Sequence, residues 1–586
     1  MRYRLRAERR ARAALFSGRV AVLCLWRGER RDCGAQDLGG MSALRQMIAR
    51  PADRDPIWRF PAEDIDLPLP DILSRARRMA GGMAQNGITA KDRVITLLDT
   101  GSDAVITLLA IWHLGAVAVP LRPQRAAECG RNLVSDVIAI CAAKAVIHGT
   151  APAGPDRPDG ARDLHIAQLM AASAPYPPAA ECGAADLALI QFTSGSTGQP
   201  RGVRVRYAMI TAQLEQLCEN YRVGDPAISP GSVGSWLPIY HDMGLFIGML
   251  MPLYCGADAL LAPPEYYVRN PARWFRALSD RRCDLTFSTS SILAATLRAA
   301  RRLSAEDCDL SRLVLYVAAE KISPLVMDDL MRRLGPLGLG PANLRTGYGM
   351  AEYALGCTSS GSGPVARQHV RIDGDRVIPG PTCPDSSEIV SIGKPNTGCT
   401  LAIRDPAGVG LPDWRLGEIT LVGPCLTDGY QNDPAATRRA LGCGYLKTGD
   451  LGFTAAGEVY FVGRQDDTMT VAGRHIVPGD VELEIEALPF VGPGRSRLFG
   501  TDAMDTQTPR QILLIESPTP WTTAQATERI ATIRRLTLGR FGFVPSDIVP
   551  VRRGTIEKTS SGKKRNRVIK QRWLAGEIPR LATEGA

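Results

Sequence analysis

Glycine and hydroxyl-bearing residues directly follow an apolar run in residues 187–206, LALIQFTSGSTGQPRGVRVR. The apolar run predicts a buried strand, and the glycines after it let backbone N–H groups converge on an anion. The hydroxyl donors of this loop are Thr193, Ser194, Ser196 and Thr197. Arg201 adds a positive charge just beyond them. This combination suits a phosphate group, although a flexible serine–glycine turn has the same composition.

Two standard nucleotide-binding patterns do not fit this loop. The P-loop of nucleoside triphosphatases needs the spacing GxxxxGK[ST], which Gly195 and Gly198 do not meet. The dinucleotide fingerprint GxGxxG does not fit either. The loop therefore predicts a phosphate site of another type.

Length and composition indicate a globular chain with more than one folded unit. The chain has 586 residues, 45% hydrophobic and 22% charged, and single cores rarely grow beyond about 300 residues. The sequence contains no apolar run long enough to cross a bilayer, so we expect no transmembrane segment. The 14 cysteines are scattered without a CxxC pair. This pattern argues against a zinc site or a disulfide framework, and it favours a reducing, cytoplasmic location.

The net charge of +10 comes from the two ends of the chain. Residues 1–40 contribute +6 and residues 551–575 contribute +8, so the remainder carries −4. A nucleic-acid-binding role would rest on these ends alone, and we expect none.

Residues 1–40 differ in character from the rest of the chain. A signal peptide fits poorly because Arg19 interrupts the apolar part and no clear cleavage site follows. An arginine-rich organellar presequence is an alternative. Met41 begins a stretch that looks like an ordinary start, so we interpret residues 1–40 as a disordered extension or a mis-assigned start.

From about residue 70, helical patterns alternate with apolar strand-like runs. We predict strands at residues 92–99 and 116–121 with a helix at 101–115 between them. The same alternation returns in residues 131–149 and 270–289. Short connections between such elements imply parallel sheets with helices on both faces.

The pattern changes near residue 386 to short strands separated by Gly, Pro, Asp and Asn. Such strands are expected at residues 388–395, 399–405, 417–423 and 457–464, which predicts appended antiparallel structure. Residues 357–386 lack strong periodicity and suggest a long surface insertion. We place a domain boundary at residues 465–467.

The stretch TSGSTGQPRGV resembles the phosphate-binding loop of the adenylate-forming superfamily, which includes acyl- and aryl-CoA synthetases, adenylation domains and luciferases. Six further motifs follow in the order of that family. They are WLPIYHDMGL (236–245), LRTGYGMAEYALG (344–356), GEITLVGP (417–424), YLKTGDLG (445–452), GRQDDTMTVAGRHIVPGDVE (463–482) and EKTSSGKKRN (557–566). Together they span most of residues 70–570, and an ordered series is far more specific than any single motif.

Within that superfamily the chain most resembles the fatty acyl-AMP ligases. The stretches at residues 236–278 and 389–406 are similar to their signatures, and residues 357–386 lie where those enzymes carry extra residues. In that branch the insertion implies hindered movement of the small domain and transfer to a carrier protein rather than to CoA.

The resemblance implies an α/β fold of two domains. Residues 41–465 would form a large domain of parallel sheets with flanking helices and a small antiparallel, barrel-like part. Residues 466–586 would form a smaller, mobile α+β lid. The reaction implied is ATP- and Mg²⁺-dependent conversion of a fatty or related carboxylic acid to acyl-AMP, then transfer to the phosphopantetheine arm of an acyl carrier protein in polyketide or lipopeptide synthesis.

Three alternatives stay open at this point. An acyl-CoA ligase shares the first half-reaction. An amino-acid adenylation enzyme would need an acidic anchor for the α-amino group, which is not evident in the sequence. A binding protein on an inactive fold is disfavoured because Glu352, Asp450 and Lys563 are all present.

The motifs carry implied roles for individual residues. Residues 193–198 would cradle pyrophosphate, Tyr348 would stack on adenine beside Gly349 and Met350, and Glu352 would hold magnesium. Asp450 would bind both ribose hydroxyls. A helix acid, a core aromatic and a turn aspartate are the ordinary interpretations of Glu352, Tyr348 and Asp450.

Other implied roles concern charge transfer and movement. Arg464 would contact ribose or phosphate, and His241 would lie beside the substrate carboxylate. Lys563 would bridge that carboxylate and the α-phosphate. Asp466 would be the hinge between the domains.

The basic residues near Lys563 have a different interpretation. We expect them to be solvated charges facing an acidic carrier protein: Lys564, Arg565, Arg567 and Lys570.

Several departures from the family pattern leave the acyl specificity open. Arg201 stands where lysine is usual, and Tyr207 stands near a common histidine position. VAAEKIS at residues 317–323 and TFSTSSILAATLRAAR at 286–301 also differ from the typical runs. Residues 285–297 would line an acyl tunnel or form plain core.

Overall fold

The computed structural model describes residues 55–581 apart from nine internal gaps: 124–132, 150–160, 172–181, 194–199, 222–230, 382–385, 472–473, 502–509 and 559–563. The chain divides into residues 1–41 and residues 42–586, and every described residue belongs to the second unit. The predicted extension, residues 1–40, lies outside the described residues.

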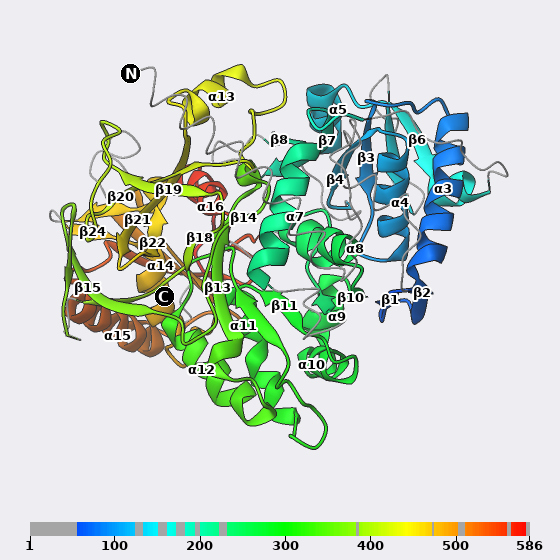
Figure 1. Ribbon diagram of the computed structural model, residues 1–586. Coiled ribbons are helices and arrows are strands. Elements are labelled where there is room, and N and C mark those ends of the chain that lie inside the picture. Colours follow the sequence, from blue (N-terminus) through cyan, green and yellow to red (C-terminus); the bar gives the residue numbers. More distant parts are fainter. Residues whose placement is uncertain are drawn as a thin grey trace. The chain divides into compact units, whose positions relative to one another are not determined.

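A six-stranded sheet has the order β6-β5-β3-β4-β7-β8 (Figure 1). Its strands are β3 (Arg93–Leu97), β4 (Val117–Leu121), β5 (Ala145–His148), β6 (Arg162–His165), β7 (Leu187–Thr193) and β8 (Arg201–Arg206). Neighbouring strands run parallel except β7 and β8, which are antiparallel. The strands predicted at 92–99 and 116–121 and the parallel arrangement are confirmed.

Helices cover both faces of this sheet. Successive residues of a strand point to opposite faces, so neighbouring residues contact different helices. Val94 packs with α3 (Leu69–Gln85) and α4 (Ser102–His113). Ile95, the next residue, packs instead with α5 (Leu133–Cys141). Burial on both faces explains why these strands read as continuous apolar runs in the sequence.

A second sheet of nine strands has the order β18-β14-β13-β12-β11-β9-β10-β1-β2. Its strands are β1 (Ile57–Phe60), β2 (Ile65–Pro68), β9 (Ser232–Ser235), β10 (Asp258–Leu261), β11 (Leu285–Ser288), β12 (Val314–Val317), β13 (Leu344–Gly349), β14 (Gly356–Ser359) and β18 (Lys394–Pro395). The run β13-β12-β11-β9-β10-β1 is parallel throughout. At the two ends of the sheet, β2 pairs antiparallel with β1, β14 with β13, and β18 with β14. The carboxyl ends of β11, β12 and β13 therefore meet at one edge of the sheet.

The remaining helices of the parallel region follow strands of both sheets. They are α6 (Ile166–Met170), α7 (Tyr207–Tyr221), the π-helix Gly244–Leu250, α8 (Met251–Cys255), α9 (Pro264–Arg269), α10 (Pro271–Asp280), α11 (Ser290–Thr296) and α12 (Pro324–Leu334). Figure 1 shows α11 and α12 following the green strands of the second sheet.

The antiparallel structure predicted after residue 386 is present. It is a meander of β19 (Thr400–Arg404), β20 (Gly417–Val422), β21 (Leu446–Ala455) and β22 (Glu458–Arg464), with α13 (Pro434–Leu441) between β20 and β21. Each pair of neighbours in the meander is also consecutive in the chain, which is why turn-separated runs predicted it well.

The segment at residues 357–386 is more regular than expected. It contains β15 (Arg367–Asp373) and β16 (Arg376–Pro379), which join β17 (Ser387–Val390) in a three-stranded antiparallel sheet. Gly374 has φ +59 at the two-residue turn between β15 and β16. The Gly-Asp pair that forms this turn, Gly374 and Asp375, was a hairpin signal that the general lack of periodicity obscured.

The C-terminal region builds its own cores. A sheet of β25 (Ser496–Thr501), β26 (Arg510–Ser517) and β27 (Asp547–Arg552) packs with α14 (Pro478–Glu486), α15 (Thr523–Phe541) and α16 (Asn566–Leu574). A short hairpin of β23 (Met469–Val471) and β24 (Arg474–Ile476) precedes it. The two hydrophobic clusters of this region contain no residue before Met469.

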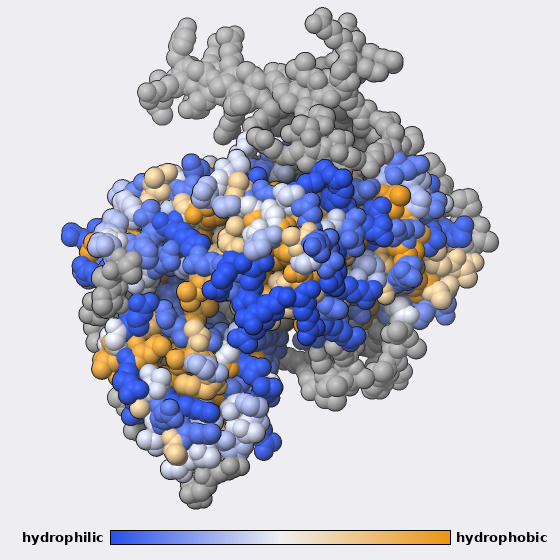
Figure 2. Space-filling view, turned by 90° about the horizontal axis from the view of Figure 1, so that it is seen from below, coloured by the Kyte–Doolittle hydropathy of each residue, from blue (hydrophilic) through white to orange (hydrophobic). Residues whose placement is uncertain are grey.

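The surface is mixed in character. Hydrophilic residues cover much of the coloured face in Figure 2, with smaller apolar patches between them. Within the part of the chain that the structure describes, no helix combines the length and apolar character needed to span a bilayer.

Replacing Gly244 with alanine is expected to destabilise the protein by about 2 kcal/mol, a typical cost of overpacking. A Cβ at Gly244 would lie 2.1 Å from the carbonyl oxygen of Pro238, which is backbone and cannot rotate away. Chemical denaturation monitored by intrinsic fluorescence measures the change. Gly335→Ala is the matched control, because a Cβ there meets nothing within 4 Å; equal stability of the two variants would contradict the prediction.

Candidate active site

One cavity of about 1770 Å³ collects most of the predicted site residues that the structure describes. The predicted residues that line it are Thr193, Tyr348, Gly349, Met350, Glu352, Asp450, Arg464 and Asp466. They come from β7, β13, the turn after β13, β21, β22 and the 3₁₀-helix Gln465–Asp467. Segments separated by more than 250 residues in sequence thus face one space.

Some predicted residues are not placed in this cavity. Ser194, Gly195, Ser196, Thr197, Gly198 and Lys563 lie outside the described residues. His241 is described but does not line the cavity, whereas the next two residues, Asp242 and Met243, do. The backbone N–H of His241 donates to the carbonyl of Pro238 at 3.0 Å.

The ends of the predicted phosphate loop open into this cavity. Thr193 and Arg201 are register partners in the antiparallel pair of β7 and β8, so they close the base of residues 194–200. Both line the cavity. The Arg201 guanidinium carbon lies 5.8 Å from the ring centre of Tyr430. A positive charge is therefore fixed at one end of the loop.

Asp450 is the centre of a polar group on the cavity wall. Its Oδ2 accepts a hydrogen bond from the Tyr348 hydroxyl at 2.6 Å, and its Oδ1 lies 3.1 Å from Arg464 Nε. The antiparallel register of β21 and β22 places Asp450 opposite Arg464. Asp450 is only 6% exposed, so these two donors hold a largely buried carboxylate in a defined direction.

The pKa shifts of Tyr348 and Arg464 keep both residues as donors toward Asp450. Burial and then the Asp450 carboxylate raise the pKa of the Tyr348 hydroxyl well above its ordinary value. Burial alone would lower the pKa of Arg464, but Asp450 raises it. The tyrosine therefore keeps its proton as a donor, and the arginine keeps its charge.

Glu352 is oriented by a second tyrosine. The Tyr430 hydroxyl donates to Glu352 Oε1 at 2.8 Å, and burial followed by Glu352 raises the pKa of Tyr430. Gly349 makes the tight turn before Glu352 possible, because a Cβ there would lie 1.8 Å from the Leu355 carbonyl oxygen. Sequence reasoning missed Tyr430, since the stretch DGYQND marks a turn but does not single out the tyrosine.

The sequence profile of the AMP-binding enzymes matches residues 58–431. The chain belongs to this family. FadD26 of Mycobacterium tuberculosis, a long-chain-fatty-acid–AMP ligase, is 30% identical over 546 residues, which cover 87% of this chain and 92% of FadD26. FadD25 of the same species carries the name of a fatty-acid–CoA ligase and is 27% identical over 543 residues, with the same two coverages.

Solved structures have the same fold. A structure from studies of fatty acyl-adenylate ligases from E. coli and L. pneumophila superposes with a TM-score of 0.81 at 25% identity, covering 92% of this chain and 98% of that one. A fatty acyl-adenylate ligase from L. pneumophila, in complex with acyl adenylate and pyrophosphate, superposes with a TM-score of 0.66 at 21% identity, covering 92% and 96%. The second likeness concerns the fold alone.

The acidic side chains of this AMP-binding enzyme can be compared with those that magnesium needs. Among the described residues, no group of three or more His, Cys, Asp or Glu could enclose a metal ion. Magnesium is commonly held by one or two carboxylates together with substrate phosphates and water. Glu352 is one of several acids that line the cavity, and its carboxylate fits that mode of binding.

Residues 285–297, the predicted acyl segment, lie partly in the core and partly on the cavity wall. Leu293 and Leu297 are buried in the core, whereas the cavity is lined by Phe287, Ser290, Ser291 and Ala294. The Glu320 carboxylate accepts a hydrogen bond from the backbone N–H of Ser291, at the start of α11. Residues 318–321 of the atypical run 317–323 also line the cavity.

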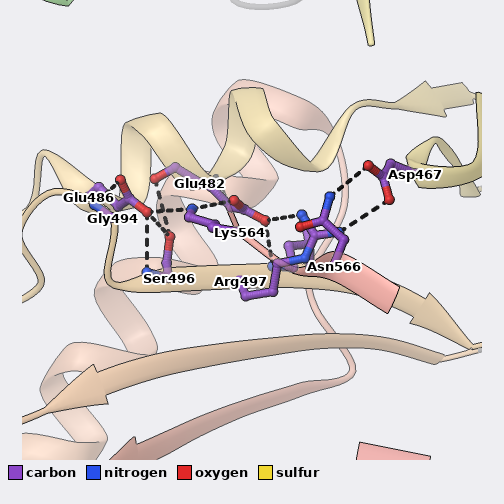
Figure 3. A network of polar contacts seen from close by, with 9 residues as sticks. Asp467, Glu482, Glu486, Gly494, Ser496, Arg497, Lys564 and Asn566 are labelled. Carbon is purple, nitrogen blue, oxygen red and sulfur yellow. Dashed lines mark hydrogen bonds and ion pairs between the residues drawn. The ribbon is translucent and has the colours of Figure 1, made fainter. Parts of the chain in front are cut away.

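The prediction that Lys564 is a solvated charge is wrong. Its Nζ lies 2.5 Å from Glu482 Oε2 and 2.8 Å from Glu486 Oε1, and its side chain is 18% exposed (Figure 3). Arg565 is exposed as expected, although it pairs with Glu557 at 3.1 Å. The two acids that pair with Lys564 are about 80 residues away in sequence, so the local run KKRNR gave no sign of these ion pairs.

Replacing Glu482 with glutamine is expected to cost about 3 kcal/mol of stability at neutral pH, because it unbalances a buried group of charges. Burial alone would raise the pKa of Glu482, but Lys564 and Arg497 hold it below 4.5. Its contribution is therefore present above pH 4.5 and is lost as pH falls through the folded-state pKa. Melting temperatures of wild type and variant should converge in acid.

The stability difference between wild type and Glu482→Gln also has an upper pH limit, and a second variant serves as its control. Burial alone would lower the pKa of Lys564, but Glu482 and Glu486 raise it above 10.5, so its contribution persists up to that pH. Glu528→Gln on the exposed face of α15 should differ little from wild type at any pH. A Glu482→Gln deficit that stays constant from pH 7 to below the folded-state pKa would contradict this account.

Proposed function

We propose that the protein activates a fatty or related carboxylic acid with ATP, forming acyl-AMP and pyrophosphate, and transfers the acyl group to the phosphopantetheine thiol of an acyl carrier protein. Family membership and the name of FadD26 support the first step. The observation that carries the proposal is the single cavity shared by Thr193, Glu352 and Asp450. These residues stand at the points where phosphates, magnesium and ribose would lie.

The adenosine half of ATP would bind between Tyr348 and Asp450. The ring of Tyr348 stacks near Phe461, with 6.2 Å between centroids, and adenine would use its cavity-facing side. Asp450 is held by Tyr348 and Arg464 from within the protein. A carboxylate has capacity for more than two hydrogen bonds, so Asp450 can also accept from ribose hydroxyls.

The chemical step brings two anions together. The substrate carboxylate oxygen attacks the α-phosphorus, a new C–O–P linkage forms, and the bond to the β-phosphate breaks as pyrophosphate leaves. Arg201 and the backbone N–H groups of the loop would stabilise the phosphates, and Lys563 would bridge the carboxylate and the α-phosphate. Magnesium, when bound by Glu352 and phosphate oxygens, supplies further neutralisation of charge. His241 would act beside the substrate carboxylate, next to the cavity-lining Asp242.

We further propose that residues 41–465 and 466–586 move as two domains about Asp466. Support comes from the C-terminal hydrophobic clusters, which contain no residue before Met469. Asp466 is exposed in the short 3₁₀-helix Gln465–Asp467, free of dense core packing. The lid would carry Lys563 into the cavity. The ten described cysteines are free thiols, which supports a cytoplasmic location.

Acid-dependent exchange of radiolabelled pyrophosphate into ATP tests the first half-reaction. Lys563→Ala is expected to lower kcat at least about 100-fold, as for other groups that stabilise transition-state charge. Asp450→Ala is expected to raise the KM for ATP at least about tenfold, since two ribose contacts are lost. Lys144→Ala, at an exposed position before β5, is the control. Exchange that is absent in wild type, or unaffected in Lys563→Ala, would contradict the proposal.

The second half-reaction separates the carrier-protein acceptor from CoA, the acceptor in the name of FadD25. Purified enzyme with fatty acid and MgATP is offered CoA or a phosphopantetheinylated carrier protein. We expect a thioester on the carrier protein and little acyl-CoA. Acyl-CoA as the main product would favour the CoA ligase alternative while leaving the first half-reaction intact.

A further inference from the structure

Lys564, the residue next to Lys563, is held by two carboxylates. Figure 3 shows its ammonium group lying between Glu482 and Glu486 of α14. Lys564 also forms an isolated antiparallel bridge with Lys558, and Arg565 N donates to the Glu557 carbonyl at 2.8 Å. The residues on the two sides of 559–563 are therefore paired with each other, and Lys564 is part of this pairing.

The two carboxylates are themselves fixed by β25 and the turn before it. Glu482 Oε1 accepts from Arg497 Nη1 at 2.9 Å and from Leu498 N at 2.8 Å. Glu486 accepts from Gly494 N at 2.6 Å and from the Ser496 hydroxyl at 2.9 Å. The acceptors for Lys564 therefore have little freedom to move, and they define its position closely.

The same network reaches the residue after the predicted hinge. Asp467 accepts from Asn566 Nδ2 at 2.6 Å and lies 3.6 Å from Arg497 Nη2. Asn566 begins α16, two residues after Lys564. Polar contacts therefore hold the chain at Lys564 and at Asn566, just after residues 559–563.

A buried lysine in this place needs a reason beyond stability. Pairing two buried charges often gains little over well-packed apolar residues, whereas it does fix geometry when several hydrogen bonds converge. A bridging lysine at the neighbouring position must reach the reacting atoms accurately, because a misplacement of about 1 Å can cost about 100-fold in rate.

We propose that Lys564 is a positioning residue, which sets where the neighbouring Lys563 enters the active site through its ion pairs with Glu482 and Glu486. The inference rests on the proposed role of Lys563 in adenylation. It also gives two consecutive lysines different tasks: Lys564 holds the chain through two glutamates, and Lys563 acts on the substrate in the proposed reaction.

A double-mutant cycle with Lys563 tests this inference. Lys564→Met should lower kcat for pyrophosphate exchange about 10- to 100-fold while the KM for ATP changes less than about threefold. Lys564→Arg, which keeps the charge, should restore part of the lost rate. In the Lys563→Ala background, Lys564→Met should cause no further loss, because a positioning residue acts only through the residue that it positions.

Controls keep the test independent of folding. Arg553→Met removes an exposed positive charge from the turn after β27 and should retain the wild-type rate. If Lys564→Met does not fold, Glu486→Gln replaces it in the same cycle, since it removes one of the two charges but keeps Lys564. We expect a smaller loss of kcat that again disappears in the Lys563→Ala background.

The outcomes separate the two proposals. Full exchange activity in Lys563→Ala would overturn the role of Lys563 and with it the proposed function of the lid. A slow Lys563→Ala enzyme whose rate falls further, by the same factor as wild type, on adding Lys564→Met would overturn only the positioning role. Wild-type kcat in folded Lys564→Met would overturn it as well.

Discussion

Repulsion between a carboxylate and a triphosphate is the constraint that this architecture has to meet. The two anions come within bonding distance only where cations and oriented N–H groups lower the cost. In the parallel region, the carboxyl ends of β11, β12 and β13 open at one edge of the sheet. The cavity at that edge is also lined by Thr193 at the end of β7 and by residues of the antiparallel β21 and β22.

The acids of the cavity show how the protein manages negative charge of its own. Glu352 and Asp450 each accept a hydrogen bond from a tyrosine hydroxyl, Tyr430 and Tyr348 respectively. A hydroxyl donor orients a carboxylate without cancelling its charge. Under the proposed function, this leaves Glu352 able to bind a metal ion and Asp450 able to bind ribose. The C-terminal network differs, because there two cations, Lys564 and Arg497, balance the charge of the buried Glu482.

Features with a local physical cause could be predicted from the sequence. Strands buried on both faces, such as β3 and β4, appear as apolar runs, and the meander from β19 to β22 appears as runs separated by turn residues. The close turn at Gly349 belongs to a motif that the sequence displays. The expectation that Tyr348, Glu352 and Asp450 surround one nucleotide came from the resemblance of their motifs to those of the adenylate-forming enzymes, and all three line one cavity.

Features that depend on distant partners could not be predicted in this way. Tyr430 approaches Glu352 across 78 residues, and Lys564 meets Glu482 across 82. Neither pair leaves a periodic signal, and Lys564 within KKRNR has the composition of a solvated tail. The hairpin of β15 and β16 was missed for a different reason, because its Gly-Asp turn lies in a segment rich in Gly, Pro and Ser.

The most direct measurement is a crystal structure of the protein with a non-hydrolysable acyl-adenylate analogue. The account predicts adenine against the ring of Tyr348 and ribose hydroxyls within hydrogen-bonding distance of the Asp450 carboxylate. Adenosine bound outside this cavity, or inside it without contact to Asp450, would contradict the account.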